Sequence, residues 1–347
     1  MTATETAVLV NTPNGLYCPD GDFYIDPYRP VDNAIITHGH SDHARPGMGS
    51  YWCSAASEPL LRHRLGADIQ LTALEYGQQV AFNGVTVSLH PAGHIRGSAQ
   101  VRVANKGQVW VVSGDYKRCY DPTTEPFEVI PCDVFITEAT FANPIYRWRP
   151  GVETAGEIYD WWMSNRAQGL TSILFCYALG KVQRVLAELV NFTQEPVYAH
   201  GAVMPLYEIY QQQGVPMLPV QNTAQLEKSH DYTGGLVVAP PSAHRSTWMK
   251  RFKNVSTGFA SGWMQVRGAR RRRGYHRGFV MSDHADWQGL IDTVQQTGCR
   301  QVYATHGDEE TLTRYLRSID VQADSLSSLP RLQPQTTLQV SREAAEQ

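Results

Sequence analysis

The segment that most constrains this chain is THGHSDHA at residues 37–44, which follows an apolar run at residues 31–36. It places three imidazoles and one carboxylate within six positions, at His38, His40, Asp42 and His43. His38 and His40 are two positions apart, so on an extended backbone their side chains point to the same side. Imidazole and carboxylate are ligands that a borderline-soft divalent cation prefers, with coordination positions left open for water. The spacing therefore predicts a metal-binding loop.

The composition is that of an ordinary globular protein. The chain has 347 residues, 42% of them hydrophobic and 18% charged, which is enough for two lobes with a substantial core. A net charge of −3 gives no general basic signature, so a polyanion would be held by a local patch or by bound metals. No stretch approaches the roughly 18 apolar residues of a membrane span, and the six cysteines form no CxxC pair. We therefore expect a cytoplasmic protein with reduced thiols and no membrane partner.

Further polar residues follow apolar runs that we predict to be strands. They are His94, Asp115, Glu138, His284 and His306. In layered α/β folds, binding and catalytic residues gather where strands end. We therefore expect these side chains to converge with the loop at residues 37–44.

Seven of these residues would suffice for a site that holds two divalent cations. The expected ligands of one ion are His38, His40 and His94. Those of the other ion are Asp42, His43 and His306, and Asp115 is expected to bridge the pair. Two cations about 3.5–4 Å apart activate a water and clamp a phosphoryl oxygen during in-line displacement. The ligand types permit either zinc or manganese.

The character of the chain changes near residue 146. Predicted helices at residues 156–168 and 180–192 alternate there with predicted strands, as in an α/β unit. The predicted divisions are a first domain part at 1–146, an inserted α/β domain at 147–276, and a second part of the first domain, with a polar C-terminal tail, at 277–347. Both ends of the chain are thus expected to build one domain.

The combined motifs resemble the metallo-β-lactamase fold, whose HxHxDH loop stands here at residues 38–43 and is followed by a lone His and a lone Asp, His94 and Asp115. Three later positions resemble those of the β-CASP nuclease branch, and they are Glu138, His284 and His306. The resemblance implies an α/β protein: a metallo-β-lactamase αββα sandwich with an inserted β-CASP α/β cap domain. The active site is then expected in the cleft between the two lobes.

Within that branch, the segments SDHADW at 282–287 and SGWM at 261–264 look most like the bacterial ligase-associated DNA exonucleases. Those enzymes are relatives of the Artemis-type repair nucleases and of the RNA 3′-end-processing endonuclease. The resemblance implies a DNA-repair exonuclease that degrades DNA from the 5′ end, with a DNA ligase and a helicase as partners. A metal-bridging hydroxide would be the nucleophile, and the expected catalytic residues are Asp42, Glu138 and His284. His284, oriented by Glu138, would protonate the departing 3′-oxygen as general acid.

Two residues favour an alternative substrate. Artemis-type DNA enzymes usually carry an apolar residue at the position of His306, whereas RNA enzymes carry His, and Glu rather than Asp at position 138 points the same way. An RNA endo- or exonuclease is therefore the first alternative. A small-molecule hydrolase acting on a thioester or lactam is the second, although such enzymes lack both the cap and the arginine run. The third is a binding subunit with a decayed metal site, which the complete set of ligand types disfavours.

Residues outside the cluster are candidates for binding substrate. The only basic run contains Arg270, Arg271, Arg272 and Arg273, which would clamp a nucleic-acid backbone or form a solvated loop. Lys181 follows Gly180 at a predicted helix start and would grip a terminal phosphate together with backbone amides. Trp263 and Tyr275 are available to stack on a base.

Overall fold

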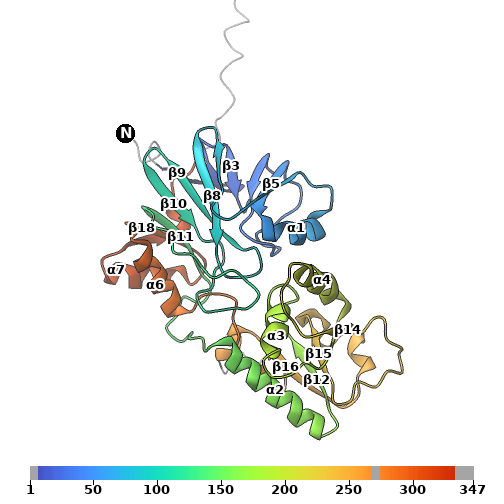
Figure 1. Ribbon diagram of the computed structural model, residues 1–347. Coiled ribbons are helices and arrows are strands. Elements are labelled where there is room, and N and C mark those ends of the chain that lie inside the picture. The colour runs from blue at the N-terminus through green and yellow to red at the C-terminus, as the bar shows by residue number, and fades with distance from the viewer. Residues whose placement is uncertain (1–6, 267–273, 333–347) are drawn as a thin grey trace, which may run out of the picture.

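The computed structural model describes residues 7–266 and 274–332 of the chain, which form two lobes (Figure 1). One lobe contains two β-sheets and is built from segments near both ends of the chain, drawn blue to teal and red in Figure 1. The other lobe, drawn green to gold, contains a third sheet. In the part of the chain that the model describes, no helix has the length and apolarity needed to cross a lipid bilayer.

The first sheet follows the order of the chain. Its six strands are β1 (Val10–Thr12), β2 (Gly15–Cys18), β3 (Phe23–Ile25), β4 (Asn33–Ile35), β5 (Ser50–Ser54) and β6 (Leu71–Leu74). Helix α1 (Glu58–Leu65) lies between β5 and β6 and has a proline in its first turn, where the missing N–H costs no helical hydrogen bond. Leu61 of α1 packs with Tyr51 and Cys53 of β5, so α1 covers the outer face of this sheet.

The second sheet joins strands from distant parts of the chain, in the order β19-β18-β11-β10-β9-β8-β7. These strands are β7 (Gln79–Phe82), β8 (Val85–Pro91), β9 (Ala99–Asn105), β10 (Gln108–Val112), β11 (Val134–Ala139), β18 (Gln301–Gly307) and β19 (Gln322–Ser325). Strand β18 pairs in parallel with β11 although more than 160 residues separate them in sequence. Helices α6 (Trp287–Thr297) and α7 (Glu309–Ser318) flank β18 in the chain.

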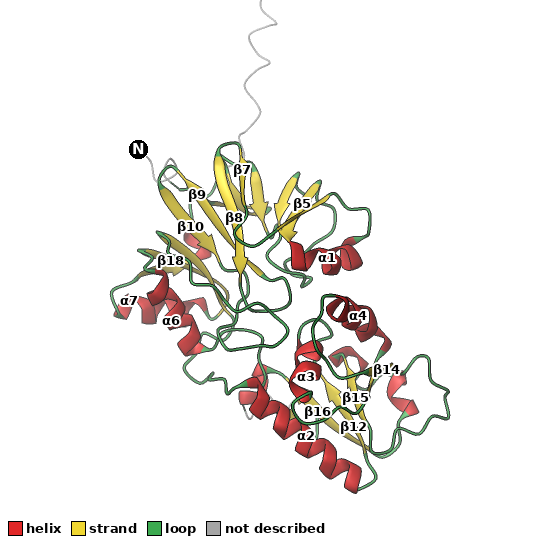
Figure 2. Cartoon of the chain, in the orientation of Figure 1, coloured by secondary structure: helices red, strands yellow, loops and turns green. Residues whose placement is uncertain are grey.

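The two sheets stack face to face around a common core (Figure 2). Val87 of β8 and Ile136 of β11 pack against Phe23 of β3 between the sheets. Phe135 precedes Ile136 and therefore faces the opposite side of the sheet, where it packs with Leu290 of α6 and other residues of α6 and α7. The layers are thus helix, sheet, sheet, helix, which confirms the αββα sandwich predicted from sequence.

The third sheet is entirely parallel, in the order β14-β13-β15-β12-β16-β17. Its strands are β12 (Thr171–Phe175), β13 (Val197–Ala199), β14 (Val220–Asn222), β15 (Leu236–Ala239), β16 (Val255–Ala260) and β17 (Arg277–Phe279). The lobe also contains α2 (Gly151–Ala167), α3 (Lys181–Leu189) and α4 (Met204–Gln212). A parallel sheet needs both faces covered, and apolar clusters lie on each face, one of them built with α2 and α3.

The predicted domain boundaries stay predictions, but one strand bears on the second of them. Strand β17 begins at Arg277, the first residue of the predicted returning part, and pairs with β16 of the inserted sheet. The third sheet therefore extends to Phe279. Residues 280–286 then lead back to the sandwich and enter α6.

Candidate metal centre

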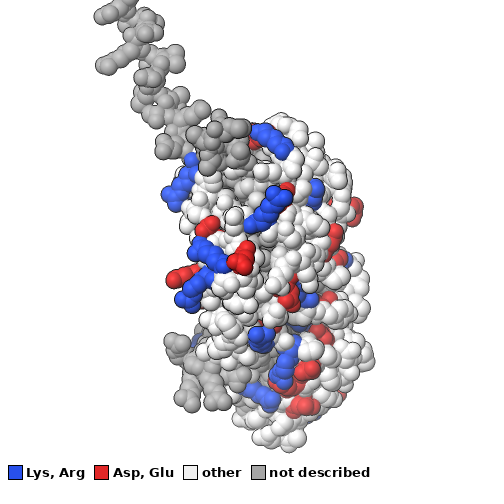
Figure 3. Space-filling view, turned by 90° about the vertical axis from the view of Figure 1, so that its left-hand side faces the viewer, with Lys and Arg blue, Asp and Glu red and all other residues white. Residues whose placement is uncertain are grey.

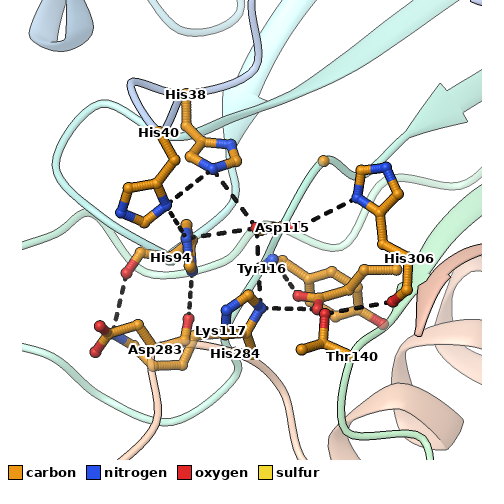
Figure 4. A network of polar contacts seen from close by, with 12 residues as sticks. His38, His40, His94, Asp115, Tyr116, Lys117, Thr140, Asp283, His284 and His306 are labelled. Atoms are coloured by element: carbon orange, nitrogen blue, oxygen red, sulfur yellow. Dashed lines mark hydrogen bonds and ion pairs between the residues drawn. The ribbon is translucent and has the colours of Figure 1, made fainter. Parts of the chain in front are cut away.

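Most of the predicted site residues lie together, and Figure 4 shows His38, His40, His94, His284 and His306 around Asp115. His38, His40 and His43 lie on the loop after β4, and His94 and Asp115 lie on the loops after β8 and β10. Glu138 and His306 lie near the ends of β11 and β18, and His284 lies in the segment before α6. The carboxylate of Asp115 is at the centre. Its Oδ2 lies 3.6 Å from the Nε2 atoms of His38 and His43 and 3.7 Å from that of His94, and its Oδ1 lies 4.0 Å from Nδ1 of His306. One carboxylate thus faces imidazoles from several strand ends.

A first group consists of His38, His40, His94 and Asp115, whose potential ligand atoms all lie within 4.8 Å of one another. Nδ1 of His40 is 3.2 Å from Nε2 of His38 and 3.1 Å from Nε2 of His94. Burial lowers the pKa of His38, His40 and His94, so these rings are neutral and can offer a lone pair. Three neutral ring nitrogens pointing at a shared space are the donor set that a divalent cation requires.

A second group consists of His43, Asp115 and His306. Nδ1 of His43 donates to Oδ2 of Asp26 over 2.7 Å, which leaves Nε2 directed at Asp115. That Nε2 is buried and has no hydrogen-bond partner among the described residues. A buried polar atom without a partner is costly, and a cation at this position would satisfy it. The donor sets of both groups therefore fit divalent metal ions.

Asp26 was not predicted as a site residue. Its carboxylate accepts from the backbone N–H of Thr37 at 2.8 Å and from the Thr37 hydroxyl at 2.5 Å, in addition to His43. It thereby fixes the tautomer and the orientation of His43, as carboxylates behind metal-binding histidines commonly do. The signal was present in the sequence, because Asp26 directly follows the apolar strand β3, as Asp115 follows β10 after two further residues.

Asp42, predicted as a ligand of the second ion, lies apart from both groups. Its side chain is 69% exposed, and its Oδ2 lies 4.0 Å from Nε2 of His43. Among the described residues, it belongs to none of the clusters whose ligand atoms all lie within 4.8 Å of one another. Its role as a ligand stays a prediction.

His306 is placed by an irregularity in the sheet. Strands β11 and β18 pair with Glu138 opposite Thr305 and with Ala139 opposite Gly307, so His306 is an extra residue that forms a bulge. It has a positive φ of 55°, and Gly307 follows with a φ of 131°. A Cβ at Gly307 would overlap the carbonyl group of Ala139. The bulge therefore requires glycine at this position, and it aims the imidazole at Asp115.

The buried Glu138 and the partly exposed His284 form a pair beside the cluster. Nδ1 of His284 lies 2.8 Å from Oε2 of Glu138, whose Oε1 accepts from the backbone N–H of Tyr116 at 2.7 Å. Burial disfavours the charged ring, but Glu138 and Asp115 outweigh it and raise the pKa of His284 to about 9. In the protein without bound cations, the charged form of His284 is therefore favoured at neutral pH. Because Nδ1 binds Glu138, the proton that it can transfer is on Nε2.

An aromatic residue holds the His284 segment in place. The indole N–H of Trp148 donates to the backbone oxygen of His284 at 2.8 Å, and its backbone N–H donates to Asp286 at 2.9 Å. Phe141 lies between the rings of Trp148 and Trp263 and contacts the His284 ring at a centroid distance of 5.7 Å. Trp148 is a second residue of the site that the sequence did not single out.

A cleft of about 600 Å³ opens over the cluster. The sandwich contributes His40, Asp115 and His284 to its lining, and the inserted lobe contributes Tyr177 and Trp263. On the face drawn in Figure 3, Lys and Arg side chains of the described residues are interspersed with Asp and Glu. That face therefore offers no field of a single sign.

The predicted substrate-binding residues have different positions. Lys181 lines the cleft, but its Nζ lies 2.6 Å from Oδ2 of Asp283, and its side chain is only 3% exposed. Trp263 also lines the cleft, whereas the ring of Tyr275 stacks on Phe259 at 4.9 Å. The four arginines at 270–273 lie outside the described residues.

Comparison with known proteins gives several relatives, although no family model matches the chain. A "probable DNA ligase" of Opitutus terrae is 30% identical over 313 residues, which cover 89% of this chain and 30% of that protein. "RNase aCSPSF2" of Saccharolobus solfataricus is 30% identical over 40% of this chain and 28% of its own length, and "endoribonuclease ysh1" of Aspergillus fumigatus is 26% identical over 46% of this chain and 20% of its own length. The chain thus spans less than a third of each of these relatives.

A solved structure from Enterococcus faecalis, of a protein of unknown function, has a similar fold. It superposes with a TM-score of 0.58 at 9% identity and covers 89% of this chain and 80% of that one. The layered sandwich, the inserted lobe, the histidine cluster and the sequence relatives together define the class. The chain belongs to the β-CASP branch of the metallo-β-lactamase fold.

We predict that Gly307→Ala weakens zinc binding by about 10- to 100-fold, because the added Cβ displaces the bulge that aims His306. Zinc affinity would be measured by competition with a chromogenic chelator. Gly77→Ala is the matched control, since Gly77 has a φ of 78° but no atom near its added Cβ. Equal zinc affinity of the Gly307 and Gly77 variants would contradict this role of the bulge.

We also predict that zinc affinity rises with pH up to about 9. Burial opposes protonation of His43, but Asp115 and Asp26 outweigh it and raise its pKa to about 9, so a cation at Nε2 must displace a proton below that pH. Asp26→Asn removes one of these negative charges and lowers the pKa of His43, so the rise should level off at a lower pH.

Chelator competition at a series of pH values measures this profile. Asp68→Asn, at an exposed position in the loop after α1, is the control. If Asp26→Asn leaves the pH dependence of zinc affinity unchanged, His43 is not the group whose proton zinc displaces.

Proposed function

We propose that this chain is a metal-dependent nuclease that hydrolyses phosphodiester bonds with two divalent cations, zinc or manganese. The observation that carries the proposal is the combination of two adjoining donor groups around Asp115 with a protonated His284 at their edge. Nδ1 of His284 lies 4.0 Å from Oδ2 of Asp115, so an acid and a metal site share one cleft.

When bound, the two cations would activate water and neutralise the charge that develops on the phosphoryl oxygens. The residues of the chain then have separate tasks. His38, His40 and His94 would hold one ion, His43 and His306 would hold the other, and Asp115 belongs to both groups. Asp42, exposed at the rim of the cleft, is proposed to join His43 and His306 as a ligand.

His284 is the proposed general acid. Its Nε2–H would protonate the departing 3′-oxygen, while Glu138 keeps Nδ1 protonated and the ring oriented. Glu138 is 1% exposed and also accepts from the N–H of Tyr116, so its carboxylate has little freedom to move. The negative charge of Glu138 therefore stabilises the acidic form of His284 until the proton is transferred.

We propose DNA as the substrate, degraded from its 5′ end during repair. The "probable DNA ligase" of Opitutus terrae matches 89% of this chain, whereas the two named ribonucleases match 40% and 46% of this chain. Action together with a DNA ligase and a helicase follows from the resemblance to ligase-associated exonucleases. The arginines at 270–273 stay in the proposal as contacts to the DNA backbone on sequence grounds alone.

RNA is the second candidate substrate. His306 points into the cluster, where Artemis-type DNA enzymes usually have an apolar residue, and its Nδ1 is within 4.0 Å of Asp115. A small-molecule hydrolase has weaker support. The "UPF0173 metal-dependent hydrolase" of Methanosphaerula palustris is 35% identical but matches only 20% of the chain.

Matched 5′-phosphorylated DNA and RNA strands, labelled at either end, distinguish these candidates. We expect the purified protein with zinc or manganese to shorten DNA stepwise and to release the 5′ label first. Internal cuts in RNA with intact DNA would favour the second candidate. Asp115→Asn is the inactive control for contaminating nuclease. Failure of the wild-type protein to cut either strand, or equal cutting by Asp115→Asn, would contradict the proposed activity.

We predict that His284→Ala lowers kcat about 10²- to 10⁴-fold, which is the usual contribution of a positioned general acid. Metal content should stay near that of the wild type, because His284 is not one of the seven predicted ligands and its Nδ1 is engaged by Glu138, with which it forms a third cluster at Asp115. Thermal stability should fall, because Glu138, which is 1% exposed, loses its ionic partner. His63→Ala, at an exposed histidine of α1, is the control. Turnover of His284→Ala at the wild-type rate would remove His284 from the mechanism.

A further inference from the structure

Two of the histidines in the first donor group are oriented by backbone carbonyls next to the inserted lobe. Nε2 of His40 lies 3.3 Å from the carbonyl oxygen of Leu179, in the turn before α3. Nδ1 of His94 lies 2.6 Å from the carbonyl oxygen of Asp283, in the segment that returns from the third sheet to α6 (Figure 4). Each ring therefore donates its N–H to a carbonyl and presents the other nitrogen, without a proton, to the cluster.

These two carbonyls belong to segments that are tied to each other by buried charges. Lys181, two residues after Leu179, places its Nζ 2.6 Å from Oδ2 of Asp283. Arg184, one turn further along α3, lies 3.4 Å from Oδ1 of Asp283 and donates to the carbonyl of Ser282 at 2.5 Å. Asp283 is 4% exposed, and Lys181 and Arg184 are buried as well. The start of α3 and the His284 segment are therefore held as one unit.

The network also reaches the sandwich. Arg184 lies 3.5 Å from Asp121, which forms a buried ion pair with Lys117. Nζ of Lys117 donates to the backbone oxygen of His94 at 3.4 Å. His94 is thus held at its ring by Asp283 and at its backbone by Lys117, and both contacts belong to the same ionic network.

Close packing reinforces this link at Gly180, the residue between Leu179 and Lys181. Gly180 has a φ of 88°, and a Cβ there would overlap the side chain of Ile95, the neighbour of His94. The backbone of the inserted lobe at Gly180 therefore packs directly against the side chain of Ile95 in the His94 loop. Oriented carbonyls and buried ion pairs both depend on this approach.

We propose that Lys181 and Asp283 are positioning residues that make the first metal site depend on docking of the inserted lobe. Their ion pair keeps the carbonyls of Leu179 and Asp283 in the places where they orient His40 and His94. Lys181 then affects the site without contacting a metal ion, through the carbonyls that orient His40 and His94. This inference rests on the proposed metal binding, and it gives the buried Lys181 a role other than gripping a phosphate.

The test measures the rate at which the folded protein releases zinc to a chelator. It also measures the melting temperature of the metal-free protein. Asp283→Asn keeps the backbone carbonyl and the shape of the side chain but removes the charge that faces Lys181 and Arg184. Lys181→Met removes the other partner of the pair. Arg166→Met is the control, because it breaks an exposed ion pair of the same lobe, with Glu195, away from the cluster.

We expect Asp283→Asn and Lys181→Met to release the more labile portion of the zinc about tenfold faster than the wild type, and Arg166→Met to match the wild type. The cobalt-substituted Asp283→Asn variant should also show a changed visible absorption spectrum, which a purely structural role would not produce. Unchanged zinc release and an unchanged spectrum in folded Asp283→Asn would overturn the inference, even if its melting temperature fell. Wild-type protein that binds no zinc would instead overturn the proposed function.

Discussion

The site depends on the contacts between one buried carboxylate, that of Asp115, and the imidazoles that surround it. Asp115 is 6% exposed, and ring nitrogens of five histidines lie within 4.0 Å of its oxygens: His38, His43, His94, His284 and His306. Burial opposes its ionisation, but the neighbouring histidines, His43 foremost, outweigh that and hold the pKa of Asp115 well below its usual range. The cluster is assembled only when strand ends from both parts of the sandwich meet.

The two lobes contribute in different ways. The αββα sandwich supplies the side chains that we predict to be ligands, because its strands end at one edge and place His38, Asp115 and His306 there. The inserted lobe supplies one wall of the cleft and, through the start of α3, the carbonyl that orients His40. Its parallel sheet has apolar clusters of its own on both faces.

Much of the site was predictable because its chemistry is local in sequence. The HxHxDH spacing and the polar residues after apolar runs identified the residues that converge on Asp115. The same rule would have identified Asp26, which also follows a strand. Spacing could not reveal that Asp42 stays exposed, because its orientation depends on the tight loop rather than on residue type. The partner of Lys181 was equally hidden, since Asp283 lies 102 residues away in sequence.

Element positions show the same division between local and long-range information. The helix predicted at 156–168 begins earlier, at Gly151, where its backbone lies against Arg184 and Glu188 of α3, a contact that local sequence does not reveal. The predicted strands that precede His94, Asp115 and Glu138 coincide with β8, β10 and β11, where apolar residues are concentrated. The pairing of β17 with β16, by contrast, joins segments on either side of residues 267–273 and depends on the whole sheet.

The most direct test of the central claim is the anomalous scattering of crystals grown with zinc or manganese. The account predicts two peaks, about 3.5–4 Å apart, on either side of the Asp115 carboxylate. One should lie among His38, His40 and His94, and the other beside His43 and His306. A single peak away from Asp115, or no peak at a metal concentration that supports cleavage, would contradict it.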